Sequence, residues 1–316
     1  MTLMTNLLSI QNSLQLPHSG ENKALDKVIR ASLKRKGRIG LTAVEHEILP
    51  WNADLFFLDE SNLFKRLDTQ KQHAILTECN DFILSESYFI EKAGLAYCAK
   101  MILAGETTEI RQMYGLIASD ESVHLQWLSP FVKEFLRITP QGKFIYSITK
   151  MIDECDANTL YYLVQTILEG WGIFYYKTLA TTCQREDLQS VFLNIVKDEA
   201  IHHKTGVALF DPRKLNTHAE RKIIDGIKAY IDALRVGTQD IVSCVEKHTG
   251  ELSLTELISL FEDLQTEITS TIKLNVLKEI MHQPGMEHFI NNLEEKRYFF
   301  PYSAKSCAEI YIQQRK

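Results

Sequence analysis

The feature that most constrains how this chain folds is an internal repeat. The pattern Asp-Glu-x-x-His occurs at residues 120–124 and again at 198–202, an offset of 78 residues (198 minus 120). A further glutamate, Glu91 in the first half and Glu169 in the second, precedes the glutamate of each pattern by thirty residues. Because the intervals repeat together with the patterns, we expect both halves to fold in the same way.

A third Glu-x-x-His, formed by Glu279 and His282, shows what a chance occurrence looks like. Lysine rather than aspartate precedes its glutamate, and a threonine stands thirty residues upstream. By contrast, the stretch 89–101 (FIEKAGLAYCAKM) aligns in register with 167–179 (ILEGWGIFYYKTL). The repeat therefore extends over whole segments of the two halves.

Apolar residues recur mostly with a helical period, which predicts an all-α fold. Asp68 and Gly105 are typical of the start and the end of a long helix. Pro130 is expected to kink the second helix. The expected helices span 68–105, 107–140, 158–183, 186–210, 215–247, 253–282 and 286–296, followed by an irregular aromatic tail.

No Ser/Gly-rich linker or low-complexity tract divides the chain, so we expect a single domain, residues 1–316. Within it we expect an N-terminal extension, a four-helix core that carries both halves of the repeat, and C-terminal helices that cover this core. Their approximate bounds are 1–65, 66–212 and 213–316.

The repeated residues have the spacing of metal ligands. Residues three apart lie on one face of a helix, so each Glu-x-x-His can bind one cation, and the two upstream glutamates would face inward at the same depth. Four carboxylates and two imidazoles suit two iron or manganese ions better than zinc, and they balance two divalent charges. Their neighbours are largely apolar, which argues against a set of solvated surface charges. The expected ligands are Glu91, Glu121, His124, Glu169, Glu199 and His202.

This ligand set resembles the ferritin-like superfamily of non-haem di-iron carboxylate proteins, over about residues 66–212. The aspartate before each Glu-x-x-His is similar to that of the oxygen-activating members: soluble hydroxylases, acyl carrier protein desaturases and arylamine N-oxygenases. The resemblance implies that Asp120 and Asp198 each hold the ring N–H of a ligating histidine. Solvated helix charges are the alternative for both aspartates.

The sequence departs from each of these subfamilies. Leu128 stands where a ribonucleotide reductase small subunit would carry its radical tyrosine, and Ile173 stands where soluble hydroxylases often carry a threonine. Ile195 replaces the third histidine of the arylamine N-oxygenases. His203, directly after the last expected ligand, is expected to support the site or to lie on the surface, because it points about 100° around the helix.

Two glycines at matching positions, Gly94 and Gly172, each follow an expected ligand by three residues. They are expected either to leave room beside the metal or to allow close helix packing. Aromatic residues cluster around them, and most are expected in the core. Tyr88, Tyr162 and Tyr176 are candidates, together with the two glycines, for lining a substrate pocket.

Composition excludes some other classes. With 45% hydrophobic and 24% charged residues and a net charge of −6, the chain has no basic excess that would suggest nucleic acid as a partner. Six widely spaced cysteines favour reduced thiols, no apolar run is long enough for a membrane span, and a cytoplasmic location is expected. The basic stretch 22–38 is read as a solvated helix face, or alternatively as a docking site for an anionic carrier.

The sequence thus favours a di-iron oxygenase with two iron ions, manganese remaining an alternative. It would use O2 to hydroxylate, N-oxygenate, desaturate or cleave a small or carrier-tethered organic substrate. An external electron donor is expected, since the chain holds no flavin or iron–sulfur motif, and a homodimer is left open. The alternatives are a ferroxidase or metal-storage bundle and a radical or Mn/Fe protein similar to ribonucleotide reductase small subunits. More than a hundred residues after Phe210 favour the enzyme, because they can enclose a pocket.

Overall fold

The computed structural model describes residues 48–140 and 143–315. The described residues form helices and no strand, which confirms the all-α fold class. Most of the N-terminal extension, including the basic stretch 22–38, lies outside the described residues. In the part of the chain that is described, no helix combines the length and the apolar character that a membrane span requires.

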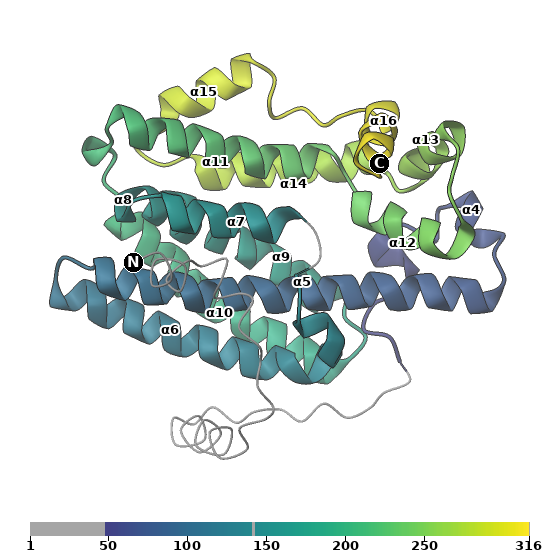
Figure 1. Ribbon diagram of the computed structural model, residues 1–316, viewed down its shortest axis with the longest axis horizontal. Coiled ribbons are helices and arrows are strands. Elements are labelled where there is room, and N and C mark those ends of the chain that lie inside the picture. The colour runs from purple at the N-terminus through teal and green to yellow at the C-terminus, as the bar shows by residue number, and fades with distance from the viewer. Residues whose placement is uncertain (1–47, 141–142, 316) are drawn as a thin grey trace, which may run out of the picture.

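The first half of the repeat forms two antiparallel helices, α5 (Thr69–Ala104) and α6 (Thr108–Leu128). Helix α5 begins where the Asp68 carboxylate accepts the Lys71 N–H at 2.9 Å, and it runs along the length of the molecule (Figure 1). A short connection at Gly105 reverses the chain into α6, which packs along α5. The expected bounds of the first long helix are confirmed.

The second half repeats this arrangement with one difference. Helix α8, the π-helix η4 and helix α9 follow one another without a break, and α10 returns antiparallel to them. Helix α10 packs against η4, α9 and α6, which joins the two halves. The bounds are α8 (Ala157–Leu160), η4 (Tyr161–Leu168), α9 (Glu169–Thr182) and α10 (Glu186–Leu209).

The expected kinked helix over 107–140 is wrong, because α6 ends at Leu128 instead of bending. Pro130 has no N–H to donate to the preceding turn, and it lies in a short 3₁₀ helix, η2 (Ser129–Phe131). A second 3₁₀ helix, η3 (Glu134–Arg137), follows. Helix α7 (Lys143–Glu154), which was not expected from the sequence, then packs along α5 (Figure 1).

The C-terminal region is more divided than expected. The helix expected over 215–247 breaks at Gly237, whose φ is 73°, and the one expected over 253–282 breaks at Gln265, whose φ is 50°. The aromatic tail YFFPYS (298–303) is irregular, as expected, and a last helix follows it. The helices are α11 (Thr217–Arg235), α12 (Gln239–Thr249), α13 (Leu254–Asp263), α14 (Thr266–Met281), α15 (Glu287–Glu295) and α16 (Ala304–Arg315).

Helices α11 and α14 lie over one side of the second half of the repeat (Figure 1). Two buried tyrosine hydroxyls connect these layers: Tyr162 donates to the Met281 carbonyl at 2.7 Å, and Tyr230 donates to the Leu163 carbonyl at 2.9 Å. The π-helix η4 is therefore enclosed between α10 on one side and the C-terminal helices on the other.

Buried apolar side chains form two clusters, one around α12, α13 and the start of α5, the other around η4, α11 and α14. Helices α5, α6 and α10 contribute to both clusters or pass between them. The most buried charged side chains of these helices lie where the two clusters meet. They are Glu91, Glu121, His124, Glu199 and His202.

Candidate metal centre

The six residues expected as ligands come together inside the protein. They form two overlapping groups, in each of which one ligand atom per residue lies within 4.8 Å of the others. Glu91 on α5 and Glu169 on α9 each belong to one group, while Glu121 on α6 and Glu199 on α10 belong to both. The groups are Glu91, Glu121, His124 and Glu199, and Glu121, Glu169, Glu199 and His202.

The Nδ1 atom of His124 faces three carboxylates. It lies 2.8 Å from Oε2 of Glu91, 3.9 Å from Oε2 of Glu121 and 3.9 Å from Oε1 of Glu199. The first two glutamates belong to the same half of the repeat as His124, and the third comes from the other half.

His202 repeats this pattern with the halves exchanged. Its Nδ1 lies 3.6 Å from Oε2 of Glu169, 3.8 Å from Oε2 of Glu199 and 3.3 Å from Oε1 of Glu121. The carboxylates of Glu121 and Glu199 therefore stand between the two imidazoles, in the place of ligands that two ions would share.

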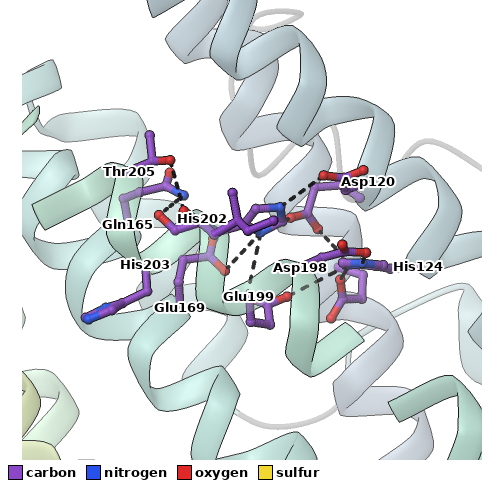
Figure 2. Close-up of polar contacts among 12 residues, drawn as sticks. Asp120, His124, Gln165, Glu169, Asp198, Glu199, His202, His203 and Thr205 are labelled. Atoms are coloured by element: carbon purple, nitrogen blue, oxygen red, sulfur yellow. Dashed lines mark hydrogen bonds and ion pairs between the residues drawn. The ribbon is translucent and has the colours of Figure 1, made fainter. Parts of the chain in front are cut away.

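The other ring nitrogen of each histidine faces an aspartate of the opposite half (Figure 2). Nε2 of His124 lies 3.2 Å from Oδ2 of Asp198, and Nε2 of His202 lies 3.5 Å from Oδ2 of Asp120. An aspartate next to each histidine ring was expected from the sequence, but the exchange between halves was not. A proton on Nε2, facing the aspartate, leaves the Nδ1 lone pair directed at the carboxylates.

Burial and mutual repulsion control the protonation of the cluster. Burial, together with the charges of Glu91 and Glu169, raises the pKa of Glu121 well above its usual value, and Glu199 is raised similarly. Burial lowers the pKa of His202, but the carboxylates of Asp120 and Glu169 outweigh it and bring the pKa to about 9. Without a cation, the cluster thus binds protons, which offset the charges of its carboxylates.

Both ring nitrogens of His202 are buried and hydrogen-bond to none of the described residues. An imidazole without hydrogen-bond partners is costly in a protein interior, and here it is surrounded by carboxylates. A cation in each group would bind the Nδ1 lone pair and offset the carboxylate charges. The residues present therefore fit a pair of divalent metal ions.

A small cavity of about 40 Å³ adjoins four of the carboxylates and has mainly apolar walls. Gly94, Gly172 and Tyr176 line it, as expected from the sequence. Tyr88 packs edge-on against Phe89 outside this lining, and Tyr162 donates its hydroxyl to α14 instead. The further lining residues are Ile90, Ala93, Tyr97, Ile148, Ile152, Val164, Leu168, Trp171 and Tyr175.

The absence of a side chain at Gly94 makes room for the carboxylate of Glu121. A Cβ atom at this position would lie 2.6 Å from Oε2 of Glu121, closer than any van der Waals contact allows. At Gly172 the equivalent atom would lie 3.4 Å from Oε2 of Glu199, which is a tight but ordinary contact. The two glycines occupy matching positions in the repeat but are not equally necessary.

Two aromatic neighbours of the cluster make contacts that were not predicted from the sequence. The Tyr176 hydroxyl, which was expected only to line the pocket, donates a hydrogen bond to Oε1 of Glu91. The Trp127 ring lies 6.0 Å from the His124 ring, nearly parallel to it. Tyr176 follows Glu169 by seven residues, two helical turns, and this spacing is the signal that could have identified it.

His203 points away from the carboxylates (Figure 2). Its Nδ1 donates to the Thr166 carbonyl at 2.8 Å, so His203 is not placed as a ligand. The third Glu-x-x-His of the sequence lies outside the cluster, with Glu279 and His282 both exposed on or next to α14.

Comparison of the chain with protein-family models, with curated proteins and with solved structures finds no match. The resemblance to ferritin-like proteins therefore depends on six residues, their spacing and their position in the structure. What the structure shows is an all-α protein with a buried Glu/His cluster that can hold metal ions.

Proposed function

We propose that the protein is a non-haem di-iron oxidoreductase that uses O2 to oxidise a small or carrier-tethered organic substrate. The observation that supports this most directly is the pair of overlapping ligand groups, which share Glu121 and Glu199. Shared carboxylates hold two ions close together, and four carboxylates balance the charge of two divalent ions. When bound, a pair of Fe(II) ions supplies electrons for the reduction of dioxygen.

The ligand side chains have distinct tasks in this proposal. Glu91 and His124 would bind one ion, Glu169 and His202 the other, and the two shared glutamates would bind both. Three further side chains would orient ligands. Asp198 and Asp120 each lie beside the Nε2 atom of a histidine, and the Tyr176 hydroxyl donates to one oxygen of Glu91.

The size and the apolar walls of the cavity limit which part of a substrate could reach the centre. At about 10 to 15 Å³ for each water molecule, its 40 Å³ hold about three waters, which is enough for dioxygen and the very end of a substrate. Its apolar walls exclude bulk water from the carboxylates. The substrate would therefore present one end to the centre, while the rest stays outside or displaces side chains such as Trp171, which lines the cavity.

The proposed reaction balances with an external reductant. Insertion of one oxygen atom into a C–H or N–H bond consumes one O2, two electrons and two protons, and it releases one water. The chain itself would bind and orient the substrate end, exclude solvent and hold the ions. The electrons come from a separate donor protein or, in a desaturation, partly from the substrate.

The test begins with anaerobic loading of Fe(II) and measurement of bound iron per chain. Rapid mixing with O2 would follow, with the visible spectrum recorded for the wild type and for Glu169→Ala. We expect two irons and a transient absorbance in the wild type, and one iron without the transient in the variant. Glu279→Ala is the matched control, because it removes an exposed glutamate of the third Glu-x-x-His.

Other outcomes would contradict the proposal. Repeated oxidation of many irons per chain, without a transient, would indicate a ferroxidase or a metal store. Tight binding of one manganese and one iron would indicate a heteronuclear centre. Absence of iron binding in the wild type would reject the metal centre altogether.

A further inference from the structure

The two halves of the repeat differ in the turns that precede the third glutamate. The residues before Glu91 belong to the regular helix α5, whereas Tyr161–Leu168 form the π-helix η4, which ends where Glu169 begins. A π-helix contains one residue more than the corresponding stretch of α-helix. The residues that follow it therefore point in a different direction around the helix axis. It is intrinsically unfavourable, and it persists where surrounding contacts hold it.

Two hydrogen bonds between α10 and η4 hold η4 in place. Nδ1 of His203 donates to the Thr166 carbonyl at 2.8 Å, and the Gln165 side-chain amide donates to the His202 carbonyl at 3.0 Å. Within η4, the Thr166 hydroxyl donates to the Tyr161 carbonyl at 2.8 Å. The His203 imidazole thus binds a backbone carbonyl of η4, and the Gln165 side chain binds the backbone of α10.

Close backbone approach also fixes the segment. A Cβ atom at Gly206 on α10 would lie 2.6 Å from the carbonyl carbon of Gln165 and 2.7 Å from the amide nitrogen of Thr166. These are backbone atoms, which cannot rotate aside as a side chain can. A Cβ atom at Gly170 would lie 2.9 Å from Nδ1 of His203, so the imidazole also fills the space beside the residue that follows Glu169.

None of these residues recurs in the first half. At the offset of 78, leucines stand in place of His203 and Gly206, lysine in place of Gly170, serine in place of Gln165 and tyrosine in place of Thr166. Glu91 and Glu169, the two glutamates that belong to only one group each, differ as well. The Glu169 side chain is 11% exposed and that of Glu91 is 2% exposed. The difference between the halves is therefore built from several residues that act on one segment.

We infer that the two metal positions are not equivalent, and that His203 is a positioning residue for the position formed by Glu169 and His202. This inference rests on the two-metal centre of the proposed function. With Gly206, His203 holds η4 in its π-helical form and thereby sets the direction of Glu169. Return of η4 to a regular helix would move Glu169 by one residue, about 100° around the axis, and remove it from the cluster.

The test measures metal binding rather than activity. Metal-free protein would be titrated anaerobically with Co(II) in a calorimeter, and Co(II) absorbance would give the coordination of each ion. We expect two ions per wild-type chain. In His203→Gln the second ion should bind about 10- to 100-fold more weakly, while the first ion keeps its affinity.

His203→Asn is the rescue variant. The asparagine amide can occupy the place of Nδ1 and donate to the Thr166 carbonyl, whereas the glutamine amide corresponds to Nε2 and cannot. We expect His203→Asn to restore most of the affinity for the second ion. Gly206→Ala should reproduce the selective loss through the backbone, and His282→Ala, an exposed histidine beyond α14, should change neither ion.

Thermal unfolding of each metal-free variant, followed by circular dichroism, separates misfolding from mispositioning. A wild type that binds two ions, with both affinities unchanged in His203→Gln, would overturn the inference and leave the proposed function standing. Equal weakening of both ions would overturn it too, because it indicates general loosening. A wild type that binds no pair of ions would overturn the proposed function itself.

Discussion

Oδ2 of Asp198, in the second half of the repeat, lies 3.2 Å from Nε2 of His124 in the first half. The reciprocal pair of Asp120 and His202 is 3.5 Å apart. Each half therefore orients the histidine of the other. Residues that orient a ligating imidazole typically change metal affinity by about 10- to 100-fold when they are replaced.

Asp198→Asn is accordingly expected to weaken the ion bound by Glu91 and His124 by about tenfold or more. The asparagine amide cannot accept the ring N–H as strongly as the carboxylate does, so the tautomer with a free Nδ1 is less favoured. Competition titration against a metal-binding dye would measure the loss. Asp225→Asn, an exposed position on α11, is the control. Weakening of only the other ion would show that the exchanged pairing is incorrect.

Removing a glutamate that both groups share should release more metal than removing a glutamate that belongs to one group. Glu121→Ala takes a ligand from both groups, so we expect fewer than one tightly bound ion per chain. Glu91→Ala takes a ligand from one group and should leave about one ion. Metal analysis after dialysis would distinguish these cases, and equal stoichiometry in both variants would argue against shared carboxylates.

Alanine at the two cavity glycines gives a matched comparison. Each change favours the helix by about 1 kcal/mol, so Gly172→Ala should fold with equal or higher stability, whereas the clash with Glu121 offsets this gain in Gly94→Ala. Gly94→Ala forces Glu121 aside and should abolish binding of at least one ion, whereas Gly172→Ala should retain both. Thermal unfolding and metal analysis of the same samples would measure both effects. Full metal binding by Gly94→Ala would contradict the assigned role of that glycine.

Metal affinity should rise with pH. The pKa of Glu121 and Glu199 is raised and that of His202 is about 9, so ions must displace protons at neutral pH. We expect proton release on binding at pH 7, measured by calorimetry in buffers of different ionisation enthalpy. Binding without proton release would contradict the expected charge state of the cluster.

The metal-free protein should show the opposite trend. A histidine whose folded pKa exceeds its unfolded value stabilises the fold below about pH 6.5, and this contribution is lost as pH rises through about 9. The raised glutamates act in the same direction, because the folded state binds more protons than the unfolded state. Stability of the metal-free protein should therefore fall with rising pH, and bound metal should remove most of this dependence.

Glu86, away from the cluster, provides a further pH-dependent prediction. Burial and the nearby Asp240 raise its pKa to about 7, although the Tyr175 hydroxyl donates to it at 3.2 Å. Its ionisation opposes folding as pH rises from about 4.5 to about 7. Glu86→Gln should stabilise the metal-free protein by about 1 to 2 kcal/mol at pH 8 and by less at pH 5. Urea unfolding at both pH values, with Glu60→Gln as an exposed control, would test this.

Much of the buried Glu/His cluster could be predicted from the sequence because the repeat supplies its own internal comparison. Two copies at one offset separate Glu121 and Glu199 from Glu279, which has the same local spacing. The limits of α5 were equally predictable, since Asp68 and Gly105 mark its ends. Local spacing is sufficient for these predictions because a Glu-x-x-His pair and a helix end each depend on residues that are close in sequence.

Other features depend on contacts between distant segments. The pairing of Asp198 with His124 could not be predicted, because it depends on how α6 and α10 pack. The π-helix η4 lies in an apolar run that reads as ordinary helix, and its determinants, His203 and Gly206, stand on another helix. Pro130 was recognised as disruptive, but only tertiary structure decides between a kink and an end.

The sharing of ligands between halves has a consequence for assembly. A chain with only the first copy of the repeat would hold three of the four residues of one group and one of the four residues of the other, and it could complete a group only by pairing with a second chain. The two chains, and with them the site, would dissociate on dilution. Joining both copies in one polypeptide makes assembly of the site unimolecular, so its occupancy depends on the concentration of metal and not on that of the protein.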